Sequence, residues 1–327
     1  MVNILSIVIP VYRNEGSLPD LISSLSDVSQ QAKRDFNCST EVVFVVDGSP
    51  DNCFALLAQA LPKAPFSSQL ILHSRNFGSF AAIRTGLQAS RGEHFCVIAA
   101  DLQEPPEIAL LFLNKLRLNE YDVVVGCRKN RQDPYLSRAA SGFFWKLYKR
   151  FVMPEIPEKG VDIFGCNKIF RDQLLRLSEA NSSLIGLIFW LGFRRSEVPY
   201  ERCLRQHGKS TWSLKKKFAY LFDSIFSFTD LPIKILTILG VVSLGISLFF
   251  GLVVIFAKMH GAIPVPGYAT TVLTVIFFGG LNSLGLGIVG TYAWRTFENT
   301  KGRPLAVVMT VQEFNQSKAL QLKESDD

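Results

Sequence analysis

Short apolar runs alternate with stretches of helical length through the first 128 residues of this 327-residue chain. The apolar runs fall at residues 5–12, 41–51, 70–74, 94–100 and 121–128, where the second breaks into a turn. A nearly continuous apolar run of this length is typical of a strand buried on both faces. Helices are expected from about residue 17, from about residue 51, and over residues 78–89 and 106–119. The alternation predicts an α/β fold with a doubly wound, mostly parallel sheet.

Two uncharged stretches, residues 235–257 and 270–294, follow later in the chain. A helix rises about 1.5 Å per residue, so either stretch can cross a hydrocarbon core of about 30 Å. A buried helical hairpin is the alternative, but it fits such long uncharged stretches poorly. Cations flank both outer ends, so the positive-inside rule predicts that both termini and the sheet are cytoplasmic. Asn282 and the neighbouring glycines predict close helix packing within one chain or in a homo-oligomer.

Two segments, residues 137–152 and 214–232, mix aromatic residues with cations at helical spacing. They are expected to lie in the membrane interface, although an ordinary amphipathic helix remains open for the first. The net charge of +7 favours a negatively charged membrane surface over nucleic acid. The predicted order is a catalytic domain over residues 1–213, a juxtamembrane helix over 214–232, two spans within 233–295, and a cytoplasmic tail over 296–327. The chain begins directly with a strand, which predicts no cleaved signal peptide. Six scattered cysteines predict a reducing compartment and no zinc site.

The acidic turn after the fourth apolar run is the first candidate for chemistry. Asp101 and Gln103 stand where that strand ends, and open α/β sheets bind ligands at this edge. A carboxylate and an amide oxygen are hard ligands, suited to Mg²⁺ or Mn²⁺ holding a diphosphate. Glu104, which precedes two prolines, could instead cap the following helix. This segment alone leaves the two interpretations open.

Four segments, in order along the chain, resemble the family 2 glycosyltransferases of GT-A fold. They read IVIPVYRNEGSLPDLISSL, VVDGSPD, SRNFGSFAAIRTGLQASRGE and AADLQEPPE. The paired C-terminal apolar stretches resemble the branch that acts on polyprenyl phosphates. RKNRQDPYLSRAAS and DIFGCNK are similar to segments of the bacterial undecaprenyl-phosphate aminoarabinose and glucose transferases, whereas dolichyl-phosphate mannose synthases are more distant. The resemblance covers nearly the whole chain.

The resemblance implies an inverting, metal-dependent transfer of a sugar from a nucleoside diphosphate to undecaprenyl phosphate. A UDP-sugar is the expected donor, and the bacterial inner membrane is the expected location. The product is expected to serve cell-envelope glycan or lipopolysaccharide modification. The implied nucleotide-sugar-binding residues are Pro10, Tyr12, Glu15, Asp47, Arg75, Asn76, Gly78 and Asp101.

The lipid phosphate is already anionic near neutral pH, because its second pKa is about 6, so it needs little activation by a base. Holding two anions together requires cations, and arginine forks suit phosphates. The expected acceptor-phosphate ligands are Arg128, Arg131, Arg202, Arg205 and Lys209. Asp162 matches the family's candidate catalytic carboxylate, and a turn or cap role is equally open. The expected catalytic set is Asp101, Asp162, Arg131 and Arg205.

The chain departs from the family pattern at four places. Val46 and Ala99 replace acids near the expected diphosphate site, and residues 208–212 read Gly-Lys-Ser-Thr-Trp. Ser79 and Phe80 stand where polar residues are usual, which affects the sugar pocket. A non-catalytic nucleotide-sugar-binding scaffold is one alternative, favoured by the lost acids. A processive polysaccharide synthase is another, but the chain lacks Gln-X-X-Arg-Trp and has too few spans. A nucleotide-dependent dehydrogenase is disfavoured, because no GxGxxG follows the first strand.

Overall fold

The computed structural model describes residues 4–129, 149–150, 153–157, 161, 163–179, 182–203, 214–260 and 267–315. The chain forms two compact units. One comprises Met1–Lys217 together with Pro304–Asp327, and the other comprises Phe218–Arg303.

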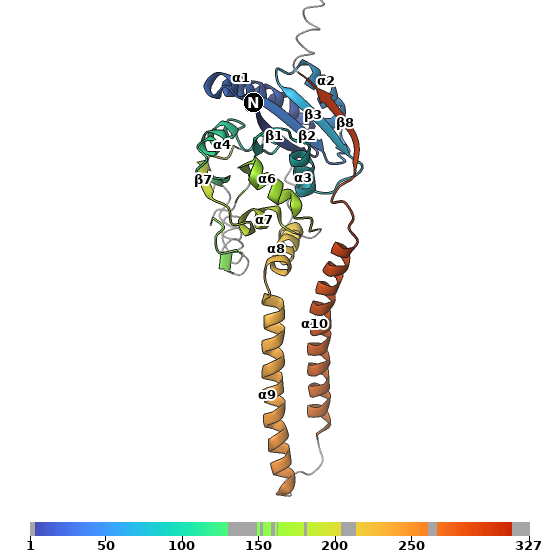
Figure 1. The fold of residues 1–327 in the computed structure, drawn as a ribbon. Helices are drawn as coiled ribbons and strands as arrows, with labels where there is room; N and C mark the ends of the chain where they lie inside the picture. Colours follow the sequence, from blue (N-terminus) through green and yellow to red (C-terminus); the bar gives the residue numbers. More distant parts are fainter. Residues whose placement is uncertain are drawn as a thin grey trace, which may run out of the picture. The chain divides into compact units, whose positions relative to one another are not determined.

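The first unit is built on an eight-stranded sheet of order β7-β5-β6-β4-β1-β2-β3-β8 (Figure 1). Neighbours among β1 to β4 pair in parallel, as do β5 and β7. β6 and β8 run antiparallel to their neighbours. The α/β class and the parallel centre are therefore as predicted, but the sheet as a whole is mixed. The strands are β1 (Ile4–Val11), β2 (Ser39–Val46), β3 (Ser67–His73), β4 (His94–Val97), β5 (Val123–Arg128), β6 (Ile163–Asn167), β7 (Arg195–Tyr200) and β8 (Val308–Phe314).

Helices cover both faces of this sheet (Figure 1). α1 (Leu18–Phe36), α2 (Cys53–Ala60) and α4 (Ile108–Arg117) pack on one face, and α3 (Ser79–Ala89) and α6 (Lys168–Arg176) pack on the other. Leu5 and Ile7 of β1 are buried in the core beneath α1 and α4. On the opposite face, a Cβ added to Gly86 of α3 would lie 2.3 Å from Val8 Cγ1. Only glycine therefore lets α3 approach the sheet this closely.

Three strands lie outside the predicted set. β6 inserts antiparallel between β4 and β5, and β7 lies beyond β5 at the edge of the sheet. β8 comes from the segment expected to be a tail. It pairs antiparallel with β3 from Ser68 opposite Phe314 to His73 opposite Val308. Residues 308–314 of the expected tail are thus part of the first unit's sheet.

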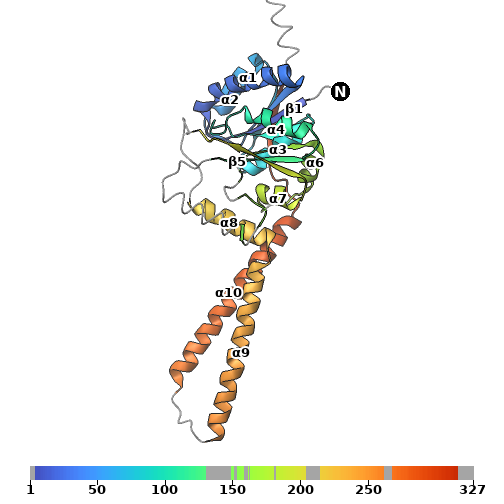
Figure 2. The same ribbon diagram turned by 90° about the vertical axis from the view of Figure 1, so that its left-hand side faces the viewer.

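The second unit is helical, and comprises most of α8 (Leu214–Phe228) with α9 (Leu231–Met259) and α10 (Tyr268–Thr300) (Figure 2). Both predicted spans fall within α9 and α10. Arg295 of α10 donates to Asp223 Oδ1 at 2.6 Å and to Ser227 Oγ at 3.0 Å, which ties α10 to α8. In the described part of the chain, one helix has the length and composition to cross a membrane, over Leu231–Phe250. The other predicted interfacial helix, residues 137–152, lies largely outside the described residues.

Candidate functional site

The loops that follow the parallel strands open at one edge of the sheet, where α/β folds bind ligands. Residues 12–15 follow β1, residues 47–51 follow β2, residues 74–78 follow β3, and residues 98–104 follow β4. Arg128 ends β5, and residues 201–203 follow β7, which is parallel to β5. This edge therefore collects the described candidates, which are Pro10, Tyr12, Glu15, Asp47, Arg75, Asn76, Gly78, Asp101, Gln103, Arg128 and Arg202. Arg131, Asp162, Arg205 and Lys209 lie outside the described residues.

Asp47 holds the loop that follows β3, residues 75–78, which we call the donor loop. Its side chain is buried, with the residue only 2% exposed. Its carboxylate accepts hydrogen bonds from Phe77 N at 2.9 Å and Gly78 N at 2.8 Å. His73 Nδ1 lies 2.8 Å from Asp47 Oδ1. The structure thus gives Asp47 a positioning role, and its direct binding of the nucleotide-sugar stays a prediction.

His73 is a site residue that the sequence analysis missed. It is the last residue of β3, its side chain is fully buried, and its Nε2 lies 3.0 Å from Thr85 Oγ1 of α3. In a neutral ring, Nδ1–H would donate to Asp47 and Nε2 would accept from Thr85. The only signal in the sequence is a histidine at the end of an apolar strand, which by itself does not indicate a partner.

The donor loop presents positive charge at the sheet edge. The Arg75 guanidinium lies 4.0 Å from the centre of the Phe77 ring, and its Nη1 donates to Asn76 O at 3.0 Å. Gly78 has φ of +98° and precedes the first turn of α3. The N–H groups of a helix N-terminus attract anions. Arg75 and the start of α3 can therefore both act on a diphosphate.

The loops after β1 and β2 brace each other. Arg13 N donates to Ser49 Oγ at 2.8 Å, and Asn52 N donates to Glu15 Oε2 at 3.2 Å. Glu15 N donates to Asp51 Oδ2 at 3.4 Å. Burial raises the pKa of Asp51, but hydrogen bonds from Ser49, Cys53 and Glu15 outweigh burial and hold that pKa below its usual value. Glu15, a predicted nucleotide-sugar-binding residue, is therefore held in place by the end of the neighbouring loop.

Backbone strain marks two of the turns at this edge. Leu102, between Asp101 and Gln103, has φ of +56°, and Arg13, after Tyr12, has φ of +57°. The left-handed conformation costs a residue with a bulky side chain about 1–2 kcal/mol. Such strain concentrates at binding sites, where the surrounding structure enforces it. The strain at Leu102 accompanies a turn in which Gln103 N donates to Asp101 Oδ1 at 3.2 Å.

Arg202 lies against the predicted metal-binding turn. Its Nη2 donates to Gln103 Oε1 at 2.5 Å, and its Nε lies 3.6 Å from Glu104 Oε1. Glu107, not Glu104, stands at the N-cap position of α4. The interpretation of Glu104 as a helix cap is therefore wrong, because its buried carboxylate pairs with Arg202. A predicted acceptor-phosphate ligand and a predicted metal ligand thus contact each other.

The residues at this turn fit a divalent metal in part. Among the described residues, no three His, Cys, Asp or Glu side chains gather into a metal-binding group. Mg²⁺ commonly needs only one or two protein carboxylates when substrate phosphates and water complete its shell. Asp101 meets that need. Gln103 can add an amide oxygen, but the Arg202 guanidinium bonded to that oxygen would repel the cation.

Comparison with known proteins identifies the family of this chain. Residues 6–177 match the family described as Glycosyl transferase family 2. An uncharacterised glycosyltransferase of Synechocystis is 32% identical over 305 residues, which is 93% of this chain and 94% of the relative.

Two further relatives have more specific names. An undecaprenyl-phosphate 4-deoxy-4-formamido-L-arabinose transferase of Pseudomonas fluorescens is 30% identical over 93% of this chain and 88% of its own length. A bactoprenol glucosyl transferase of Shigella phage SfX is 28% identical over 92% of this chain and 97% of its own length. The chain therefore belongs to glycosyl transferase family 2 and is a glycosyltransferase.

Proposed function

We propose that this enzyme transfers a sugar, with inversion, from a UDP-sugar to undecaprenyl phosphate. The observation that carries the proposal is the donor loop, which contains the cation Arg75 and which Asp47 holds at the same sheet edge as Asp101. Two relatives that match over most of their length are named for undecaprenyl-phosphate and bactoprenol transfer. The natural setting is the cytoplasmic face of a bacterial inner membrane, for cell-envelope glycan or lipopolysaccharide modification.

On this proposal, the loops that follow β1, β3 and β4 bind different parts of the donor. Pro10 and Tyr12 face the base and Glu15 faces the ribose, while Arg75 and the N-terminus of α3 face the diphosphate. Asp101, with Gln103 once Arg202 has turned away, would hold Mg²⁺ or Mn²⁺. The ion would neutralise charge that develops on the departing diphosphate. While Arg202 stays on Gln103, its guanidinium adds positive charge at the same turn.

Charge is the main obstacle to bringing the acceptor close. Two unit charges about 4 Å apart repel by roughly 4 kcal/mol at an effective dielectric of about 20. Fixed guanidinium groups offset that repulsion without reorganising during the reaction. Arg128 and Arg202 stand at the described edge for this role. We assign the same role to Arg131, Arg205 and Lys209, and place Asp162 beside the acceptor.

The membrane part of the proposal rests on the second unit. We propose that α9 and α10 both cross the membrane, with both termini cytoplasmic, and that α8 lies on the cytoplasmic leaflet among membrane lipids. Asn282 and the glycines of α10 are proposed to pack against a second copy of the chain. Cysteines introduced at residues 261–267 should react with an impermeant reagent from outside intact cells, whereas labelling of the C-terminal tail would reverse this topology.

The transfer itself can be tested with the full-length protein in lipid nanodiscs that contain undecaprenyl phosphate. A panel of radiolabelled nucleotide-sugars is supplied with Mn²⁺, and label is counted in the organic extract. We expect one donor to label the lipid with a single sugar. Arg202→Lys keeps the charge but loses the fork, so turnover should fall more than nucleotide affinity. Arg34→Lys, on an exposed side chain of α1, is the matched control. Nucleotide binding without lipid label from any donor would contradict the proposal.

A further inference from the structure

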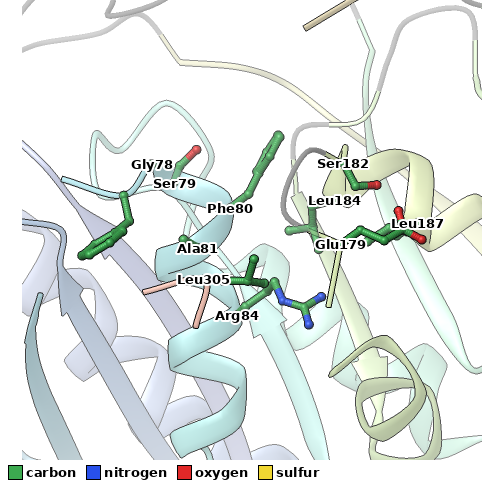
Figure 3. Close-up of a pocket in the computed structure, with 11 residues that line it drawn as sticks. Gly78, Ser79, Phe80, Ala81, Arg84, Glu179, Ser182, Leu184, Leu187 and Leu305 are labelled. Carbon is green, nitrogen blue, oxygen red and sulfur yellow. The ribbon is translucent and has the colours of Figure 1, made fainter. Parts of the chain in front are cut away.

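A cavity of about 260 Å³ lies beside the donor loop (Figure 3). Its wall is formed by the end of that loop, the first turns of α3, the segment that leads into α7 (Leu184–Trp190), and Leu305. Phe77 and Gly78 belong both to the loop and to the cavity wall. Because their backbone N–H groups are bonded to Asp47, this side of the cavity is held in place.

We propose that this cavity receives the sugar of the donor and selects sugars that carry an apolar substituent, such as an N-acyl or deoxy-methyl group. The inference rests on the proposed function, since it places the donor's diphosphate at the adjoining loop and the N-terminus of α3. A sugar linked to that diphosphate would then enter the neighbouring space.

The lining of the cavity includes large apolar side chains beside the polar Ser79, Arg84, Glu179 and Ser182. Phe80 of α3 faces Ser182 and Leu184 across the cavity in Figure 3, and Leu187 and Leu305 add to the same lining. A sugar hydroxyl buried against these side chains loses hydrogen bonds to water without replacement, which is costly. An acyl methyl group in the same position gains from burial. The lining therefore discriminates by the polarity of the sugar's substituents.

Ser79 is exposed at the first residue of α3, and three further polar side chains line the cavity. The Arg84 guanidinium already donates to Leu174 O and Leu175 O, both at 3.1 Å, which ties it to the end of α6. Ser182 Oγ is buried and has no hydrogen-bond partner within the described part of the chain. This hydroxyl can bond one polar atom of a ligand. Glu179, exposed in the same lining, disfavours an acidic sugar by like-charge repulsion.

The test compares UDP, UDP-glucose and UDP-N-acetylglucosamine, both as ligands in calorimetry and as donors to undecaprenyl phosphate. For the parent protein we expect the acetylated donor to be favoured by roughly tenfold or more in kcat/KM, the usual effect of a small apolar group in an apolar pocket. Phe80→Asn and Leu305→Asn should each lower that ratio several-fold and leave affinity for UDP unchanged. Leu111→Asn is the control, because Leu111 is 53% exposed on α4, on the opposite face of the sheet.

Three results would overturn the inference. One is a parent protein that uses UDP-glucose as well as the acetylated donor. Another is a Phe80 variant that loses affinity for UDP itself. The third is a Phe80 or Leu305 variant whose donor ratio is unchanged but which needs a different concentration of undecaprenyl phosphate for its half-maximal rate. That result would assign the cavity to the acceptor. If no donor labels the lipid but calorimetry shows tighter binding of UDP-N-acetylglucosamine than of UDP-glucose, the proposed acceptor is wrong and the cavity assignment stands.

Discussion

Replacing Asp47 by Asn tests whether the donor loop depends on this one buried carboxylate. The carboxylate contacts two backbone N–H groups and the His73 ring. An asparagine of the same size offers one oxygen and turns an NH₂ group toward a donor. An unsatisfied buried donor costs about 1–3 kcal/mol, and each hydrogen bond to a charged group contributes about 1.5–3 kcal/mol. We therefore expect the free energy of unfolding to fall by about 3 kcal/mol, which lowers the Tm by roughly 6–12 °C for a unit of this size.

Thermal unfolding of the full-length protein in detergent measures this loss, and calorimetry with UDP measures its effect on the site. Asp35→Asn makes the same chemical change on a partly exposed carboxylate at the end of α1 and should shift the Tm little. UDP affinity should fall in the Asp47 variant at temperatures where it remains folded, because the donor loop loses its anchor. If Asp47→Asn melts and binds UDP as the parent does, the buried anchor does not position the loop.

Three further predictions concern the same unit. Asp101→Asn should lower kcat by roughly 10²–10³-fold, because losing one group that stabilises charge in the transition state typically costs that much. Steady-state rates with Mn²⁺ and saturating substrates measure the loss. The hydrogen bonds from Arg194 hold the pKa of Asp122 below its usual value. Their stabilisation is therefore present above the unfolded pKa of about 3.9 and is lost as pH falls through the lower folded value. Below about pH 4, the free energy of unfolding measured with urea should change less with pH in Asp122→Asn than in the parent. Cys203 is exposed and its N–H donates to Gln103 O, so a maleimide should label it before the five buried cysteines, and UDP-sugar with Mn²⁺ should slow that labelling.

The sequence by itself determined the class of fold, the parallel centre of the sheet and the family. A strand covered by helices on both faces must be apolar along its whole length, so β1 to β5 are visible as continuous runs. The acidic turn at Asp101 and Gln103 could be predicted because parallel strands end at a common edge. The mix of aromatic residues and cations over residues 214–232 predicted a helix there, and α8 covers residues 214–228 of that range.

Only the tertiary structure decided which distant segments complete the sheet and which groups hold the site. β6 is five residues long and β8 follows the apolar helices, so neither pairing leaves a local pattern. The bond between Asp47 and His73 and the contact of Arg202 with Gln103 join residues that are far apart in the chain. Hydrogen-bond partners depend on where the strand ends meet, and hydrophobic periodicity reports only which face of an element is buried. For that reason the residues at the sheet edge could be predicted, but their partners could not.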